Sequence, residues 1–234
     1  MSAFQAAFFL RSQPWFAELP AALQEAAARS AYSVRVRKGQ VALRSGEMPA
    51  GWHAVISGVL QLQYRTGTAE RLSGLLPLAS GDWFDEGPLV QGQPRRHDVV
   101  ALRDSELLCL PQPCFGELLA GSPAFSQAVI AQLGARLAQL TAVIELERTG
   151  SIEQRLALYL SRLLCPSLPR LDLGQEELGR MAGMSRQAVN RTLPRLEQRG
   201  LVSLRGGRVH GVDHAAVDAF LGLSPRGEKV LLRA

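Results

Sequence analysis

Polar side chains that can read a base pair gather on one face of a short helical pattern in the last third of the chain. They follow Ser185 in the sequence SRQAVNR and are Arg186, Gln187, Asn190 and Arg191. Arginine pairs bidentately with the major-groove edge of guanine, and glutamine or asparagine pairs in the same way with adenine. Ser185 suits the N-cap of such a helix, whose free N-terminus can also meet a phosphate. The pattern predicts a helix whose first turns contact bases in the major groove of DNA.

A second helical pattern precedes this one and would hold it in place. We expect helices over residues 175–182 and from residue 186 onward, with Gly183 in a left-handed turn between them. Gly179 is small where the two helices must approach closely, and Val189 faces the core. The two patterns together predict a helix-turn-helix.

Prolines interrupt the pattern at two places. Pro166 and Pro169 break the chain before the helix-turn-helix. Pro194 lies inside its second helix and fits badly, because proline lacks an N–H and clashes with the carbonyl four residues back, that of Asn190. We expect a kink or one lost hydrogen bond behind the base-reading turns.

A hairpin is expected directly after the second helix. Two strand-like runs, over residues 201–204 and 209–212, are joined by Arg205-Gly206-Gly207-Arg208. A Gly-Gly pair between such runs is typical of a tight β-hairpin. The hairpin would form a wing with Arg205 and Arg208 at its tip, where they can contact phosphates. A winged helix used for protein contact is the alternative.

The charge of the chain is placed where a polyanion would be bound. The net charge is +5; residues 1–150 hold 13 basic and 13 acidic side chains, whereas residues 151–234 hold 13 and 8. Between residues 180 and 208 there are seven arginines and one acid, Glu197. A merely solvated arginine-rich face is the alternative, but its coincidence with the helix-turn-helix favours a nucleic-acid partner.

The stretch from residue 32 to about residue 110 has a different pattern. Short and often alternating apolar runs are separated by turn signals such as Ser57-Gly58 and Thr66-Gly67. Strands spaced about 8–12 residues apart predict an antiparallel sandwich or small barrel, which can enclose a ligand. Residues 14–28 before it have helical spacing. The predicted fold class is α+β: an N-terminal antiparallel β-barrel or jelly roll, a long dimerisation helix and a C-terminal winged helix-turn-helix.

Residues 81–96 of this barrel, GDWFDEGPLVQGQPRR, concentrate charge. The adjacent acids Asp85 and Glu86 are followed by the adjacent arginines Arg95 and Arg96. The stretch is either a ligand-contacting loop or a surface turn with solvated charges, and the residues alone leave both interpretations open.

A long amphipathic helix is predicted from residue 123 to about residue 148. Its apolar residues recur at steps of mostly three or four over some seven turns, at ~3.6 residues per turn. An exposed apolar stripe on so long a helix indicates a second copy of the chain as partner, although packing within one chain is the alternative. Thr149-Gly150 interrupts the pattern, and residues 152–164 form another helical pattern before Pro166. We therefore divide the chain into a barrel domain (1–122), the long helix and hinge (123–149) and a DNA-binding domain (150–234).

Several classes of protein are disfavoured. Three cysteines form neither a disulfide framework nor a metal cluster, and the four histidines have no spacing that suggests a metal enzyme of the cupin type. No uninterrupted apolar run approaches the ~18 residues of a membrane span, and no leader peptide is evident. We expect a cytoplasmic protein that is not an enzyme, contacts no membrane and has no certain cofactor.

The order of these parts resembles the CRP/FNR family of bacterial transcription regulators. The residues that carry the resemblance are GDWFDEG with the paired arginines, Thr149-Gly150, and QEELGRMAGMSRQAVNRTL. The resemblance covers nearly the whole chain. It implies a cyclic-nucleotide-binding-like sensor, a homodimer formed through the long helix, an inverted repeat in double-stranded DNA as target, and RNA polymerase as a further partner.

The sensor departs from the cyclic-AMP-binding members of that family, which carry a Gly-Glu and an Arg-Ser pair around the cyclic phosphate. Glu86 and Arg95 match these pairs, whereas Asp85 replaces the glycine and Arg96 the serine. A carboxylate beside a bound phosphate is repulsive, although Arg96 could offset it. The family's adenine-contacting Thr-Ser pair falls on Arg136 and Leu137. The candidate effector residues are Asp85, Glu86, Gly87, Arg95, Arg96 and Arg136. We hypothesise that the sensor responds to another small molecule, or to none, rather than to cyclic AMP.

The helix-turn-helix also departs from the cyclic-AMP-binding members of the family. The cyclic-AMP branch has Arg-Glu and an arginine four residues on, where this chain has Arg186, Gln187 and Arg191. Losing the glutamate removes an acceptor for a cytosine amino group, and glutamine brings a preference for adenine. The resemblance thus predicts a related but different half-site. A nucleotide-responsive module that acts through a protein partner is the alternative function, and the arginine-rich reader argues against it.

Overall fold

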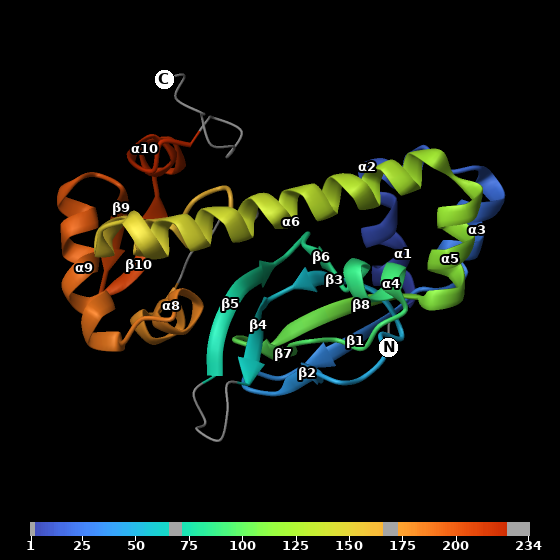
Figure 1. Ribbon diagram of the computed structural model, residues 1–234, viewed down its shortest axis with the longest axis horizontal. Helices are drawn as coiled ribbons and strands as arrows, with labels where there is room; N and C mark the ends of the chain where they lie inside the picture. The colour runs from blue at the N-terminus through green and yellow to red at the C-terminus, as the bar shows by residue number, and fades with distance from the viewer. Residues whose placement is uncertain (1–2, 66–71, 166–172, 224–234) are drawn as a thin grey trace. The chain divides into compact units, whose positions relative to one another are not determined.

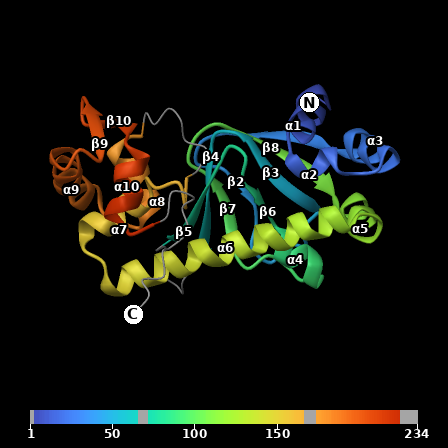
Figure 2. The ribbon, with the colours of Figure 1, turned by 90° about the horizontal axis from the view of Figure 1, so that it is seen from above.

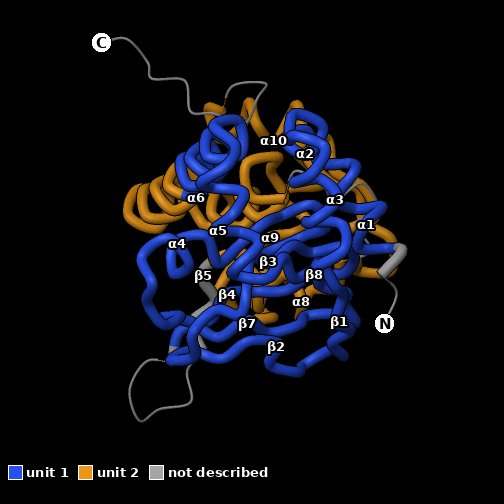
Figure 3. The backbone as a smooth tube through the Cα atoms, turned by 90° about the vertical axis from the view of Figure 1, so that its right-hand side faces the viewer, with its two compact units in different colours: residues 1–65, 78–136 blue, residues 66–77, 137–234 orange. Residues whose placement is uncertain are grey.

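The computed structural model describes residues 3–65, 72–165 and 173–223 (Figure 1). The chain forms two compact units, residues 1–65 with 78–136 and residues 66–77 with 137–234, which Figure 3 distinguishes by colour. The expected turn at Thr66-Gly67 and the breaks at Pro166 and Pro169 lie outside the described residues.

Two four-stranded sheets form the predicted barrel. The first has the order β1 (Tyr32–Val36), β8 (Ser105–Pro111), β3 (Gly51–Ser57) and β6 (Trp83–Phe84). The second has the order β2 (Val41–Leu43), β7 (Asp98–Ala101), β4 (Val59–Arg65) and β5 (Leu72–Ala79). The pairs β1/β8, β3/β8, β3/β6, β2/β7 and β4/β7 are antiparallel. The prediction of an antiparallel barrel is therefore confirmed.

Helices cover one end of these strands. α2 (Pro14–Ala17) and α3 (Ala21–Ser30) account for the helical spacing over residues 14–28, whereas α1 (Ala3–Arg11), α4 (Glu86–Gln91) and α5 (Gln112–Gly121) were not predicted. Figure 2 shows α1, α2, α3 and α5 gathered beside β3 and β8.

An aromatic cluster joins these helices to the first sheet. The rings of Trp52 and Trp83 lie 4.0 Å apart, and those of Trp15 and Phe125 lie 4.9 Å apart. All four side chains are buried in one hydrophobic core. Such rings bury much apolar surface in a fixed geometry, so the segment around Trp83, where β6 leads into α4, is firmly packed in the unit.

The long helix α6 (Pro123–Thr149) begins and ends where the sequence predicts. Its first turns pack in the aromatic core through Phe125 and Val129. Near its middle the side-chain amide of Gln139 donates to the carbonyl of Leu163 within the second unit.

The second unit holds the predicted helix-turn-helix and wing. After α7 (Ile152–Leu158) come α8 (Gln175–Ala182), α9 (Arg186–Gln198), β9 (Val202–Arg205), β10 (Arg208–Val212) and α10 (His214–Phe220). Figure 2 shows α9 beside the hairpin of β9 and β10. The predicted helix over 152–164 was too long: beyond Leu158 the backbone tightens into turns in which the N–H of Leu160 donates to the carbonyl of Ala157.

Candidate DNA interface and sensor site

The turn of the helix-turn-helix is built as its residues predict. Gly183 ends α8 with a φ of 62°, in the left-handed region. A Cβ atom added at Gly179 would lie 2.7 Å from the carbonyl oxygen of Met184, so only glycine allows this approach. The hydroxyl of Ser185 accepts from the N–H of Ala188 at 3.1 Å and caps α9. These three residues fix the direction of α9.

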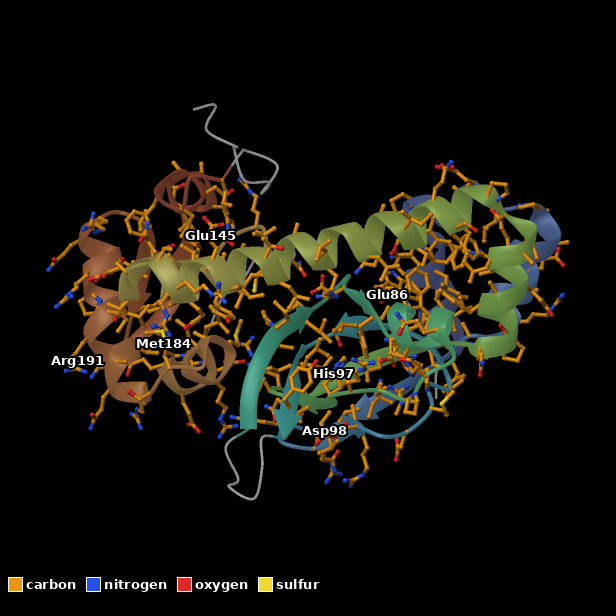
Figure 4. The ribbon with its side chains drawn as sticks, viewed as in Figure 1. Glu86, His97, Asp98, Glu145, Met184 and Arg191 are labelled. Atoms are coloured by element: carbon orange, nitrogen blue, oxygen red, sulfur yellow. The ribbon has the colours of Figure 1, made fainter. Side chains whose placement is uncertain are left out.

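The predicted reading residues share one exposed face of α9. Val189 and Leu193 are fully buried, whereas the side chains of the predicted reading residues are exposed: Arg186, Gln187, Asn190 and Arg191. In Figure 4 Arg191 points away from the unit, whereas Met184 points into it. The face therefore presents guanidinium and amide groups to solvent, which are the groups that pair with base edges.

One contact on this face was not predicted. The side-chain amide of Gln175, at the start of α8, donates to the side-chain oxygen of Asn190 at 3.3 Å. The contact joins residues 15 apart, so no local pattern in the sequence announces it.

The wing has its glycines in the left-handed region. Gly206 and Gly207 have φ angles of 57° and 75°, as a tight hairpin turn requires. Arg205 and Arg208 pair across the turn and are both exposed. The guanidinium of Arg208 lies against Gly174, since a Cβ added there would be 3.2 Å from its Nη1. Arg205 and Arg208 thus extend the basic face of α9 onto the hairpin.

Pro194 lies inside α9, which continues through it to Gln198. The ring removes one backbone donor, so the carbonyl of Asn190 loses its usual helical partner. Pro194 is exposed, so its ring takes no place in the core. The structure gives no reason for a proline at this position.

The strongest group of charges in the first unit centres on Asp85. This residue occupies the N-cap position of α4 without a side-chain capping hydrogen bond, has a φ of 76° and is the only residue other than glycine with a positive φ in the described part of the chain. Its side chain is buried, and its Oδ2 lies 2.8 Å from Nδ1 of His53 and 2.8 Å from Nε of Arg95. Nη2 of Arg95 is also 2.8 Å from that oxygen. One carboxylate oxygen therefore holds two buried basic side chains.

Neighbouring strands bring these residues together. His53 on β3 pairs with Phe84 on β6, the residue before Asp85, and the two rings stack at 5.6 Å. The backbone of Arg95 is held by Glu47, whose carbonyl accepts from its N–H at 3.0 Å. Burial lowers the pKa of His53, but hydrogen bonds to Asp85 and Cys109 outweigh it and raise that pKa to about 9. His53 is therefore a cation at neutral pH.

Glu86 and Arg136 form the adjoining part of the cluster. Nε1 of Trp52 donates to the buried carboxylate of Glu86 at 3.4 Å. Burial raises the pKa of Glu86, and the charge of Arg136 opposes that rise. Arg136 and Gln132, both on α6, donate to the carbonyl of Trp83 at 2.9 Å. Gly87 is half-buried beside them, and Figure 4 shows where Glu86 lies.

Arg96 does not join this cluster. It is exposed, and its Nη2 donates to Gln93 at 3.4 Å. The expectation that Arg96 offsets the charge of Asp85 was wrong, because Arg95 and His53 do so instead. His53 is a buried histidine with a partner. Its role beside Asp85 was missed.

No group of three or more histidine, cysteine, aspartate or glutamate side chains suited to a metal ion occurs among the described residues.

Two families match the two parts of the chain. Residues 33–122 match the cyclic nucleotide-binding domain, and residues 154–220 match the Crp-like helix-turn-helix domain. The cyclic AMP receptor protein of Thermus thermophilus is 30% identical over 173 residues, which are 74% of this chain and 80% of that protein.

Solved structures share the fold. A mutant of CooA from Carboxydothermus hydrogenoformans has a TM-score of 0.64 at 21% identity, covering 91% of this chain and 93% of that one. The c-di-GMP responsive global regulator CLP of Xanthomonas campestris has a TM-score of 0.60 at 23% identity, covering 82% and 99%. At these identities the likeness establishes the architecture of the chain.

Proposed function

Because the chain belongs to the CRP/FNR family of transcription regulators, we propose that it is a homodimer in which two α9 helices read an inverted repeat in double-stranded DNA. The chain is a DNA-binding regulator with a cyclic-nucleotide-binding-like domain, and this family is not one of enzymes. The proposal also includes the identity of the base-reading residues and a sensor that does not respond to cyclic AMP. It divides the chain into three parts, residues 1–122, 123–149 and 150–234.

The capped, exposed face of α9 is the observation that carries the proposal. Arg186, Gln187 and Arg191 would contact base edges, because they occupy the first turns and their side chains are free of the core. Asn190 would add a further contact next to Gln175. Ser185, Arg205 and Arg208 would contact phosphates and hold the register.

The dimer would form through α6. Its exposed large apolar side chains are Ile130, Leu133, Leu137 and Ile144, which are 67%, 38%, 66% and 55% exposed. With the half-buried Leu140 they follow steps of three, four, three and four, which is the heptad spacing of a coiled-coil seam. A second copy of α6 would bury this stripe.

By length and composition α6 could also cross a membrane, and only 22% of its most apolar window is buried. Two observations favour the coiled coil. The exposed apolar residues form a stripe rather than a full circle. Arg136 and Gln132 tie the middle of the helix to Trp83 of the barrel. If α6 crossed a bilayer, the barrel bound to its middle would have to enter the membrane. Packing of α6 against a second copy of itself places no such demand on the barrel.

The sensor is proposed not to be tuned to cyclic AMP. Arg95, the arginine that the resemblance assigns to a cyclic phosphate, is already bound to Asp85 at 2.8 Å. The relative named above is a cyclic AMP receptor protein and a regulator of the same fold is c-di-GMP responsive, so the fold leaves the effector open. Isothermal titration of cyclic AMP into the wild-type protein should give no binding heat; micromolar binding would contradict this part of the proposal.

Selection from random DNA tests the reading function. The pool should converge on an inverted repeat whose half-sites lie one helical turn apart. The half-site should differ from that of the cyclic-AMP branch at the base pair that faces Gln187, with adenine favoured. The alternative, a module that acts on a protein partner, would be supported if the pool does not converge. It would also be supported if random-sequence competitor DNA abolishes the gel shifts of all duplexes equally.

Leu137→Glu tests the dimer. It places a charge in the centre of the stripe, and sedimentation equilibrium should show a shift from dimer to monomer. Ala138→Glu is the matched control, because Ala138 is exposed one position away from the stripe. A monomeric wild-type protein, or equal effects of the two changes, would rule out this interface.

RNA polymerase as a further partner and a cytoplasmic location are parts of the same proposal and rest on family membership. A DNA-bound dimer that recruits or blocks RNA polymerase should change transcription in vitro from a promoter that carries the selected repeat.

A further inference from the structure

Asp85, His53 and Arg95 have the composition of an occupied anion site. The two basic side chains converge on one oxygen at 2.8 Å, and all three side chains are buried, at 5%, 4% and 3% exposure. Two buried cations this close to each other are costly unless an anion lies between them. The protein supplies that anion from its own chain.

The backbone at Asp85 indicates that the carboxylate is held there against a conformational preference. A φ of 76° disfavours residues other than glycine, although aspartate tolerates it better than most. Such strain persists only where the surroundings compensate for it. Here the compensation is the neutralisation of His53 and Arg95, so the side chain, and not the turn, accounts for the choice of residue.

The segment around Trp83 is tied to α6. Trp83, two residues before Asp85, accepts hydrogen bonds from Gln132 and Arg136 of α6 through its carbonyl. Glu86, the next residue, is held by Trp52 in the aromatic core. Hydrogen bonds within the protein thus connect the anion site to the aromatic core and to α6, the helix that would form the dimer.

We propose that Asp85 is a built-in anion that occupies, on Arg95 and His53, the place which a ligand's phosphate would otherwise take, so that DNA binding requires no anionic effector. A cyclic nucleotide-binding domain is matched over residues 33–122, and the phosphate of any cyclic nucleotide is an anion. The inference rests on the proposed DNA-binding function and extends it, because it assigns the sensor an internal ligand.

Chemical rescue of Asp85→Gly tests this directly. Glycine suits the φ of 76° and deletes a CH₂–COO⁻ group, which acetate can replace. The variant should bind the selected DNA about tenfold more weakly than wild type in chloride buffer. Acetate at equal ionic strength should restore both the affinity and the melting temperature. Asp85→Asn fills the same space without charge and should show no rescue, and neither should Glu117→Gln, which removes an exposed acid elsewhere.

Each outcome decides the matter. Acetate-dependent recovery in Asp85→Gly alone supports the built-in anion. A folded Asp85→Gly protein with wild-type DNA affinity in chloride, or a wild-type protein whose affinity rises with cyclic AMP, overturns it. If wild type binds no DNA, the proposed function fails, while the melting temperature in acetate still reports on the anion site by itself.

A wild-type measurement covers the case in which Asp85→Gly does not fold. The protein is unfolded in denaturant, dialysed to remove any bound small molecule and refolded. It should then bind the selected DNA with unchanged affinity. Recovery of DNA binding only after cyclic AMP is added would contradict the proposal.

Discussion

The two units use arginine in opposite ways. Arg95 in the barrel is 3% exposed and is neutralised by Asp85, whereas Arg186 and Arg191 on α9 are exposed on a face that carries no acid. A buried guanidinium needs its carboxylate partner, because removing one member of a buried ion pair leaves an uncompensated charge and is strongly destabilising. An exposed guanidinium remains available to a phosphate or a guanine. Whether an arginine has a structural role or a recognition role is therefore decided by its environment and not by how many arginines the unit contains.

The adjacent arginines Arg95 and Arg96 give the largest expected contrast. Arg95→Gln leaves Asp85 buried with one partner fewer and should lower the free energy of unfolding by about 3–5 kcal/mol. Arg96→Gln changes an exposed side chain and should alter it by less than about 0.5 kcal/mol. Urea unfolding measures both, and similar losses for the two variants would refute the assignment of roles.

The pH dependence of stability should report His53. Its folded pKa of about 9 lies above the ordinary value of 6.5. The stabilisation is therefore complete below pH 6.5 and is lost as the pH rises through 9, by up to about 3 kcal/mol. The side chains that face His53 are Asp85 and Cys109, with Arg95 on the far side of Asp85. His53→Gln should flatten this slope in urea unfolding between these pH values; an unchanged slope would exclude His53 as its source.

Arg186→Ala should weaken binding to the selected repeat by about 1–3 kcal/mol and relax the preference at one base pair. Arg195→Gln on the same helix is the control, because Arg195 forms an ion pair with Glu153 at 2.8 Å. Anisotropy titrations against single-base variants of the repeat separate the two. Equal losses on all of these sequences would mean that Arg186 contacts only the backbone.

Arg205→Gln at the wing tip should have the smallest and least selective effect. It removes one phosphate contact, so binding should weaken alike on all sequences and the salt slope should fall by about one. Affinities measured over a series of salt concentrations test this. A loss confined to one sequence would indicate that Arg205 reads bases.

The local structure of the helix-turn-helix could be predicted from the sequence better than the charged cluster in the barrel. The positions of Ser185, Gly183 and the exposed face of α9 follow from helical spacing and capping, which are local properties. The contact between His53 and Asp85 joins residues 32 apart on different elements, and no periodicity reveals such a pair. Arg95 and Arg96 were both candidate effector residues, yet only Arg95 is buried beside Asp85.

Helix lengths show the same limit. Both ends of α6 could be predicted closely, because its apolar spacing persists to Leu146 and Thr149-Gly150 then interrupts it. α7 ends six residues before the predicted end at residue 164, although apolar residues continue there, because these fill the core from turns instead of from a helix. α4 has only six residues, too few to show a period.

One titration tests the account most directly: the affinity of wild-type protein for its selected repeat and for a scrambled duplex, each with and without cyclic AMP, at one salt concentration. The account predicts that the repeat binds at least about 10³-fold more tightly than the scrambled duplex and that cyclic AMP shifts neither curve. Equal affinity for the two duplexes would contradict the reading function. A repeat that binds tightly only with cyclic AMP would contradict the built-in anion.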